Sequence, residues 1–151
     1  MAIYERATEA DIPELSNLLS HLFTQEVEFQ PNDSVQRQGL SAIITNPNVG
    51  AILLARDKAQ VIAMVNLLFT VSTALGGRVA ILEDMIVVPA ARGMGIGSAL
   101  LSYALEFAKH NEVKRITLLT DRENHPAQQF YSQHGFEPST MTPYRLTIPI
   151  R

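Results

Sequence analysis

The sequence predicts an α+β fold with a mixed β-sheet, and three observations point to it. Two apolar runs within residues 51–71 flank a polar turn at 56–60, which is typical of a β-hairpin. A third apolar run, residues 79–88, has the length and composition of a buried central strand. A glycine-rich loop and a helical pattern follow that strand directly. The predicted order of elements is β-α-α-β-β-β-α-β-α-β-β.

The first half of the chain is expected to hold a short strand and two helices before the hairpin. Residues 2–7 alternate as a short strand, and an apolar stripe at helical spacing continues to about Phe23. Residues 24–33 have the composition of a loop. Ser34 is expected to cap a second helix, which the Asn-Pro step at 46–47 stops.

The second half is expected to complete the sheet and to add two more helices. Apolar residues recur at helical spacing over 96–110. Residues 115–120 have the composition of a strand, and Asn124 is a suitable N-cap for a short helix. Phe136 is expected to begin a final pair of strands, of which the last covers 142–150.

Composition predicts one soluble, cytoplasmic domain over residues 1–151. No apolar run approaches the roughly 18 residues of a membrane-spanning helix, and residues 1–12 lack the apolar segment of a signal peptide. The net charge of −3 argues against nucleic acid as a partner, and we expect no membrane partner. The chain has no cysteine, and its four histidines lack metal-ligand spacing, so no metal site is expected.

The glycine-rich loop 92–97 is the strongest candidate binding site. It opens a helix, whose first N–H groups have no partner within the helix and whose dipole favours an anion. Its glycines let the backbone approach a phosphate closely, and Arg92 adds a positive charge. The spacing G-x-G-x-G differs from the dinucleotide fingerprint, and the chain contains no P-loop pattern.

Two motifs of this chain resemble those of a known enzyme family. Arg92-x-x-Gly95-x-Gly97 is similar to the acetyl-CoA-binding motif [RQ]-x-x-G-x-[GA] of the GNAT superfamily of N-acetyltransferases. The family pattern N-x-x-A-x-x-[FL]-Y-x-x-x-G-F resembles the stretch Asn124-x-x-Ala127-x-x-Phe130-Tyr131-x-x-x-Gly135-Phe136. The resemblance covers nearly the whole chain, and residues 82–98 are also close to the polyamine (diamine) acetyltransferase branch.

This resemblance implies the GNAT acyl-CoA N-acyltransferase fold, in which the fourth and fifth strands splay apart to admit the pantetheine arm. A bulge in the fourth strand is implied, which would free backbone groups around Met85, Ile86 and Val87 to pair with the pantetheine amides. Acetyl-CoA is the implied co-substrate. The other residues implied to contact it are Arg92, Gly93, Met94, Gly95, Ile96, Gly97, Ser98, Asn124, Ala127 and Tyr131.

Glu83 is the candidate general base that takes a proton from the acceptor amine. A carboxylate within an apolar strand is costly to ionise, so its pKa is expected to rise toward a useful value. Asp84 competes for the role, but successive strand residues face opposite sides, so only one of the two should line a given face. The resemblance to the polyamine branch favours Glu83, and a water or another residue is the alternative.

Tyr131 is, by the same resemblance, the candidate acid for the departing thiolate. A tyrosine pKa of about 10 lies above a thiol pKa of about 8.5, so hydrogen bonding to the sulfur is its expected main contribution. A tyrosine with a satisfied hydroxyl in the core is the alternative. A backbone N–H near Ile86 or Val87 is expected to stabilise the oxyanion.

The predicted function is acetyl-CoA-dependent N-acetylation of a primary amine of a small molecule. Acidic Glu26, Glu28 and Asp33 favour a polyamine-like acceptor. A cysteine acyl-enzyme is impossible, so we expect direct transfer in a ternary complex. The alternatives are acetylation of protein N-termini or lysines, a non-catalytic acetyl-CoA-binding module, and a nucleotide-binding regulator. The resemblance also suggests a homodimer with the final strand as a contact.

Overall fold

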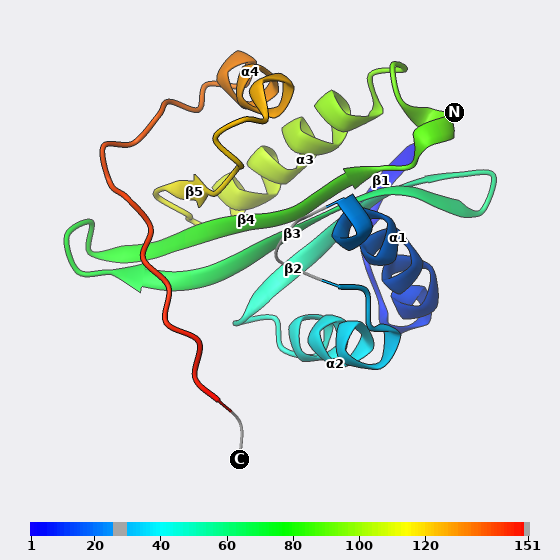
Figure 1. Cartoon of the computed structure of the whole chain (residues 1–151), viewed down its shortest axis with the longest axis horizontal. Coiled ribbons are helices and arrows are strands. Elements are labelled where there is room, and N and C mark those ends of the chain that lie inside the picture. The colour runs from blue at the N-terminus through cyan, green and yellow to red at the C-terminus, as the bar shows by residue number, and fades with distance from the viewer. Residues whose placement is uncertain (26–29, 150–151) are drawn as a thin grey trace. The chain divides into compact units, whose positions relative to one another are not determined.

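The computed structural model describes residues 1–25 and 30–149, and the chain forms two compact units. The first unit spans Met1–Leu119 and carries the β-sheet (Figure 1). The second unit, Thr120–Arg151, carries the helix α4, His125–Gln133.

The sheet of the first unit has five strands in the order β1-β2-β3-β4-β5. The first four pair antiparallel, and β5 pairs parallel to β4, which confirms the mixed sheet. The strands are β1 Ile3–Arg6, β2 Gly50–Asp57, β3 Gln60–Ser72, β4 Gly77–Val87 and β5 Ile116–Leu118.

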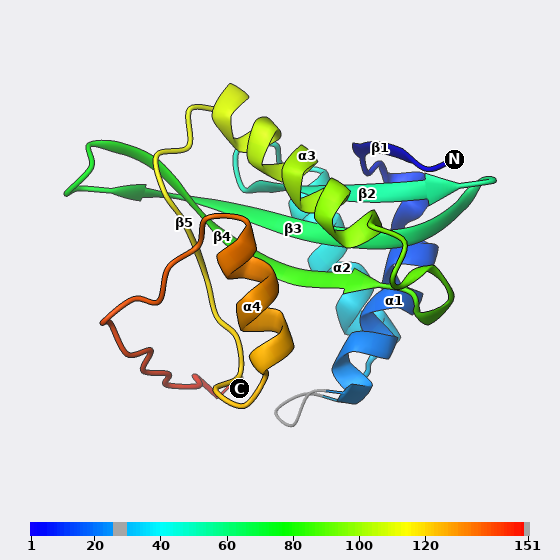
Figure 2. The same ribbon diagram turned by 90° about the horizontal axis from the view of Figure 1, so that it is seen from above.

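Helices cover both faces of this sheet (Figures 1 and 2). On one face lie α1, Ile12–Gln25, and α2, Asp33–Ile44, and the other face carries α3, Ile96–His110. Two short 3-10 helices, η1 Glu9–Asp11 and η2 Pro89–Ala91, precede α1 and α3. Below α1 and α2 the core includes Leu15, Leu19, Leu40, Ile52, Leu54, Met64 and Ile86. On the opposite face α3 buries Leu100, Leu101 and Ala104.

The strand β4 has a bulge and parts from β5, as the family resemblance implies. Three residues of β3, 64–66, span four residues of β4, 83–86, so β4 holds one extra residue. Asp84 in this bulge has a left-handed φ of 55°, which aspartate tolerates better than most residues. β4 pairs with β5 only over 80–82, so no strand of the described chain covers that edge of β4 over 83–87.

Of the two helix caps predicted from the sequence, at Asn124 and Ser34, the first is confirmed and the second is wrong. Asn124 caps α4 as predicted, because its side chain accepts a hydrogen bond from Ala127 N at 3.2 Å. The predicted cap of α2 is wrong. Asn32, not Ser34, is the N-cap, and its Oδ1 accepts from Val35 N at 3.2 Å. Both asparagines satisfy a helix N–H that has no partner within the helix.

The two strands predicted after α4 are absent from the described residues. Residues 134–149 contain no strand, neither at Phe136 nor over 142–149, and β5 is shorter than predicted. The side chains of Tyr144, Leu146 and Ile148 alternate as in a strand but are exposed. A strand requires a neighbour that exchanges backbone hydrogen bonds with it, and alternation alone does not supply one. Within the described part of the second unit no such neighbour exists.

Arg56 joins the N-terminal segment to β2, and its loss is expected to destabilise the first unit. Its guanidinium donates to Asp11 Oδ1 at 2.7 Å and to Glu5 Oε1 at 2.8 Å. The Asp11 side chain is only 11% exposed, so Arg56→Met would leave a nearly buried carboxylate without its cation. We expect the free energy of unfolding at pH 7, measured in urea, to fall by about 2 kcal/mol. Arg37→Met, which breaks an exposed pair with Asp33, should change it little.

The pairing of Asp11 with Arg56 predicts how the destabilisation caused by Arg56→Met depends on pH. Burial disfavours ionisation of Asp11, but hydrogen bonds from Thr8 N–H and Arg56 outweigh it and lower the pKa of Asp11. A lowered pKa adds stability above the unfolded value of about 4 and loses it as pH falls through the folded value. The difference between wild type and Arg56→Met should therefore shrink on acidification below about pH 4. If the free energies of unfolding of wild type and Arg56→Met differed by the same amount from pH 7 to pH 2, the stabilisation of ionised Asp11 by Arg56 would be contradicted.

Candidate active site

The predicted phosphate loop lies between η2 and α3 and opens that helix. Gly93 and Gly95 have φ values of 78° and 79°, a conformation that side chains with a Cβ rarely adopt. A Cβ at either position would meet no atom within 4 Å, so the loop surface is open. No side chain caps α3, whose N-cap is Gly95 itself. This helix end can therefore offer backbone N–H groups to an anionic ligand.

The remaining loop residues surround this helix end. Arg92 is exposed, and its Nε donates to Val87 O at 3.1 Å, which ties the loop to the end of β4. Met94 is 70% exposed, so it contributes nothing to the core. Ile96 and Gly97 are half-buried in the first turn of α3, and Ser98 is exposed. The loop thus combines backbone donors with one guanidinium.

The edge of β4 beside this loop is the second part of the site. Ile86 is buried and pairs with Met64, and Val87 pairs with Ala63. Met85 is half-buried at the bulge. Because β5 pairs with β4 only up to Leu82, backbone groups on the β5 side of this segment have no ladder partner among the described residues. An extended ligand with amide groups could pair there as an additional strand.

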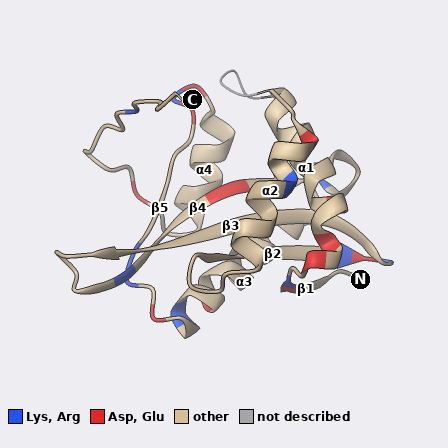
Figure 3. Ribbon diagram, turned by 90° about the horizontal axis from the view of Figure 1, so that it is seen from below, with Lys and Arg blue, Asp and Glu red and all other residues tan. Residues whose placement is uncertain are grey.

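Glu83 and Asp84 stand side by side at the bulge, and two expectations about them are wrong. Glu83 is exposed, not embedded among apolar side chains. It is the register partner of Asn66, and directly paired residues share a face. Asp84 also reaches this face, because its Oδ2 accepts from Asn66 Nδ2 at 2.6 Å. The extra residue of the bulge breaks the alternation, so both side chains lie on the face of Asn66. Figure 3 marks the acidic stretch of β4 in red.

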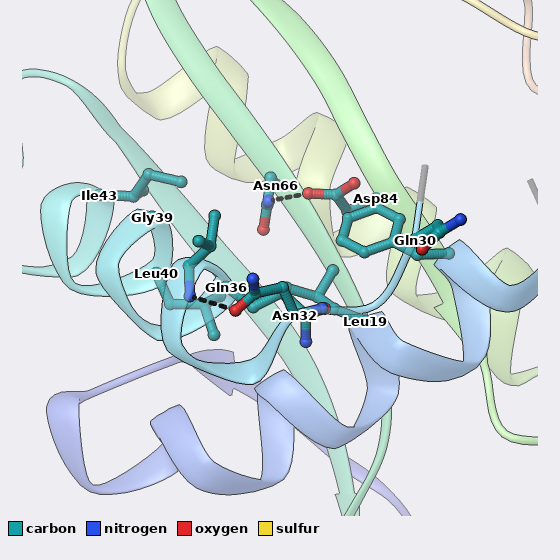
Figure 4. Close-up of a pocket in the computed structure, with 11 residues that line it drawn as sticks. Leu19, Gln30, Asn32, Gln36, Gly39, Leu40, Ile43, Asn66 and Asp84 are labelled. Atoms are coloured by element: carbon teal, nitrogen blue, oxygen red, sulfur yellow. Dashed lines mark hydrogen bonds between the residues drawn. The ribbon is translucent and has the colours of Figure 1, made fainter. Parts of the chain in front are cut away.

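A pocket of about 300 Å³ lies on this face of the first unit (Figure 4). Its apolar walls come from α1 and α2 and include Leu19, Phe23, Leu40 and Ile43. Asn66 and Asp84 line it from the sheet. Gln36 lines it as well, but its amide is occupied by Asn32 N, Ser16 and Ser20. The pocket therefore adjoins the bulge and is lined there by the Asp84 side chain.

Asn66 is the functional candidate that the sequence reasoning missed. It is 3% exposed, and its Oδ1 accepts no hydrogen bond from any described residue. A buried acceptor without a donor costs about 1–3 kcal/mol, so such atoms are uncommon in folded proteins. The available signal was one asparagine in the apolar run 61–69, where an amide has no structural reason to be.

Of the three acidic residues expected to favour a cationic acceptor, the structure describes Asp33. Glu26 and Glu28 lie outside the described residues. Asp33 accepts hydrogen bonds from Ser16 Oγ at 2.6 Å and Arg37 Nε at 2.9 Å. These two bonds hold the pKa of Asp33 below its ordinary value. Its charge is thus already compensated by Arg37.

In the second unit, Tyr131 lies on α4 among aromatic rings. Its ring centroid is 5.3 Å from that of Phe130 and 5.7 Å from that of Phe136, both in edge-to-face geometry. Burial raises the pKa of Tyr131 to about 12. The hydroxyl therefore stays protonated at every ordinary pH. The Asn124 side chain caps the helix, and its Oδ1 accepts a hydrogen bond from the N–H of the half-buried Ala127.

The described residues contain no group of three His, Asp or Glu side chains placed to hold a metal ion. No helix among them is long and apolar enough to cross a membrane.

Comparison with known proteins gives a consistent result. The profile of the acetyltransferase (GNAT) family matches residues 12–136. An uncharacterized N-acetyltransferase of Bacillus subtilis, YhfO, is 34% identical over 137 residues, which cover 88% of this chain and 91% of that protein. The aminoalkylphosphonate N-acetyltransferase of Salmonella typhimurium is 28% identical over 133 residues, covering 88% and 83%.

Solved structures show the same fold. A predicted acetyltransferase from Clostridium acetobutylicum, solved with acetyl-CoA, superposes with a TM-score of 0.80 at 22% identity, covering 97% of this chain and 96% of that one. The ribosomal-protein-alanine N-acetyltransferase of Brucella melitensis superposes with a TM-score of 0.78 at 18% identity, covering 98% and 99%.

Proposed function

Because this chain belongs to the GNAT acetyltransferase family, we propose that it moves the acetyl group of acetyl-CoA to a primary amine of a small molecule. We further propose direct transfer within a ternary complex, since the chain has no cysteine to form a thioester with the acetyl group. A relative named for aminoalkylphosphonate acetylation, itself a small amine, supports this acceptor class.

The uncapped N-terminus of α3 is the observation that carries the proposal. Its glycines present open backbone, and Arg92 adds a fixed positive charge beside it. These groups suit the pyrophosphate of CoA, while the uncovered edge of β4 suits the pantetheine amides. Together they would hold the thioester near the bulge.

At the bulge, Glu83 is proposed to take the proton that the ammonium must lose, directly or through water. Its exposure gives that proton a route to solvent. The neutral nitrogen then attacks the thioester carbonyl carbon, the C–N bond forms while the C–S bond breaks, and the nitrogen releases its second proton to solvent. A backbone N–H near Ile86 or Val87 would stabilise the oxygen as it becomes negative. The products are a neutral amide, CoA thiol and one released proton.

Tyr131 is proposed to donate a hydrogen bond to the departing sulfur. With a pKa of about 12, it is a weaker acid than the sequence alone implies. Full proton transfer to a thiolate whose conjugate acid has a pKa of about 8.5 would be uphill by roughly 5 kcal/mol. Stabilisation of the thiolate by a hydrogen bond needs no such transfer. Solvent can then protonate the released thiolate.

Tyr131→Phe is expected to lower kcat about 10- to 100-fold, the effect of losing one hydrogen bond to a charged atom. The wild-type rate should show no alkaline decline from this residue below about pH 11, because the active, protonated form is lost only as pH rises through about 12. Thiol release measured from pH 6 to pH 10.5 checks both statements. A decline near pH 8–9 that disappears in Tyr131→Phe would contradict them.

The proposed function is tested by thiol release from acetyl-CoA with a panel of amines, together with thermal unfolding in the presence of CoA. We expect CoA to raise the Tm and at least one primary amine to give turnover. Initial-rate lines should intersect when both substrates are varied, as direct transfer requires. Parallel lines would contradict direct transfer. A raised Tm without turnover on any amine would favour a non-catalytic acetyl-CoA-binding module.

A further inference from the structure

Resting on the proposed function, we infer that Asn66 binds the reacting nitrogen of the acceptor amine through its side-chain oxygen, Oδ1. One N–H of the amine donates to this oxygen. The nitrogen is thereby held next to Glu83, and its lone pair is left to face the thioester. Asn66 thus orients the substrate at the atom that reacts.

The amide of Asn66 is held in one orientation from within the protein. Among its contacts, the Asp84 carboxylate accepts a hydrogen bond at its Oδ2 from Asn66 Nδ2 at 2.6 Å. A carboxylate accepts and an amide oxygen cannot donate, so the NH₂ group must be the end that meets Asp84. Figure 4 shows the Asn66 oxygen turned away from Asp84, among the side chains that line the pocket.

This oxygen lacks the donor that a buried acceptor requires. Asn66 is 3% exposed, no described residue donates to its Oδ1, and bulk water scarcely reaches that atom. Buried polar atoms of native proteins nearly all have a partner, and each exception needs an explanation. Asn66 also stands between the buried Val65 and Leu67, where packing alone would favour another apolar side chain. An N–H of a ligand in the pocket can supply the missing donor.

The position of Asn66 beside the proposed base fits the reacting nitrogen. Asn66 is the register partner of Glu83, and directly paired residues have Cβ atoms about 5 Å apart on one face. One nitrogen can therefore give a proton to Glu83 and a hydrogen bond to Asn66. Of the three N–H groups of a primary ammonium, Glu83 takes the first proton and Asn66 holds the second. The third leaves to solvent as the C–N bond forms, and the amide product keeps the N–H that Asn66 holds.

The hydrogen bond to Asn66 becomes stronger during the chemical step. When the neutral nitrogen attacks the carbonyl carbon it becomes positive, and a charged donor makes a stronger hydrogen bond than a neutral one. An interaction that strengthens in the transition state raises kcat, and one that also aligns the lone pair favours a reactive geometry. Loss of this bond should therefore lower kcat as well as weaken binding of the amine.

Asn66→Leu removes the oxygen and nearly keeps the volume of the side chain. We expect kcat/KM for the amine to fall about 10- to 100-fold, the effect of one hydrogen bond to a charged group. The KM for acetyl-CoA and the rise in Tm with CoA should change little. Asn66→Asp keeps an acceptor oxygen, and a proton shared with Asp84 can replace the NH₂ group. This conservative variant should retain more kcat/KM than Asn66→Leu.

The probes are n-butylamine, 1,4-diaminobutane and 3-aminopropylphosphonate, which share a primary amino group on an alkyl chain. For each probe that wild type acetylates, Asn66→Leu should lower kcat/KM by a similar factor, because the hydrogen bond is made to the group that all three share. A loss confined to one probe would place Asn66 at a remote part of the acceptor and would overturn the inference.

Thermal unfolding without ligand separates substrate binding from a structural role. Asn66→Leu should change the Tm little, because its lost bond to the half-buried Asp84 is offset by the removal of an acceptor that has no donor. Gln36→Leu is the matched comparison. Gln36 is a buried amide of the same pocket, but its groups bond to Ser16, Ser20 and the Asn32 N–H. Its loss should lower the Tm clearly.

The outcomes separate this inference from the proposed function. If Asn66→Leu keeps the wild-type kcat/KM, or if its Tm falls as far as that of Gln36→Leu, the inference is overturned and the acetyltransferase stands. If no amine is turned over, the proposed function fails, and thermal unfolding of the CoA complex with n-butylamine decides. The inference then holds if n-butylamine raises the Tm of wild type but not of Asn66→Leu, and any other result overturns it.

Discussion

Glu83→Gln is expected to lower kcat for acetyl transfer at pH 7 by about 10²-fold or more, within the range of a positioned general base. A primary alkylamine with a pKa near 10.4, like that of lysine, is almost entirely protonated at pH 7, and only the neutral form attacks a carbonyl. Glutamine keeps the shape of the side chain but cannot take the proton. Thiol release with both substrates saturating measures the effect, and the KM for acetyl-CoA should be unchanged.

The pH dependence distinguishes a base from a residue that only supports the structure. As pH rises toward 9.5, more of the amine is already neutral, so the deficit of Glu83→Gln should shrink. Glu106→Gln is the matched control, because Glu106 is an exposed carboxylate on α3 that pairs with Lys109 at the surface. A deficit of equal size at pH 7 and pH 9.5, or a change confined to KM, would reject Glu83 as the base.

Gly95→Ala is expected to weaken acetyl-CoA binding about 10- to 100-fold, seen as a higher KM and a smaller rise in Tm with CoA. Gly95 has a φ of 79° at the start of α3, where a methyl group would stand between the backbone donors and an approaching phosphate. The substitution also strains the backbone by about 1–2 kcal/mol, which lowers stability without ligand. The two effects need separate measurements.

Gly76→Ala isolates the strain, because Gly76 has nearly the same φ, 74°, and a Cβ there also meets no atom within 4 Å. Gly76 lies in the turn between β3 and β4 rather than in the loop. Both variants should lose similar stability, but only Gly95→Ala should lose affinity for acetyl-CoA. Equal affinity of the two variants for acetyl-CoA would show that the loop 92–97 is not part of the binding site.

The sequence by itself determined the α+β class, the hairpin, the central strand and the helix that opens at Gly95. Each of these has a local physical cause. Apolar residues at a spacing of two or of 3.6 must face a core, and glycine, asparagine and proline mark where such elements end. The cap at Asn124 and the loop 92–97 follow from the same rules.

Only the tertiary structure decided which side chains meet at the site. The alternation rule separates Glu83 from Asp84, but the bulge against β3 brings both to the side of Asn66. Asn66 is 18 residues from Asp84 in the chain, so no local pattern could pair them. The burial predicted for Glu83 also failed, because exposure depends on what packs over a strand rather than on its neighbours in sequence.

The end of the chain also separates what the sequence determines from what the tertiary structure decides. The alternation of Tyr144, Leu146 and Ile148 comes from the sequence, yet these residues form no strand in the described structure. The periodicity of apolar residues indicates which side of a segment would pack against an apolar surface. Whether a partner strand exists depends on the position of residues far away in the chain, and that is decided only when the whole chain folds.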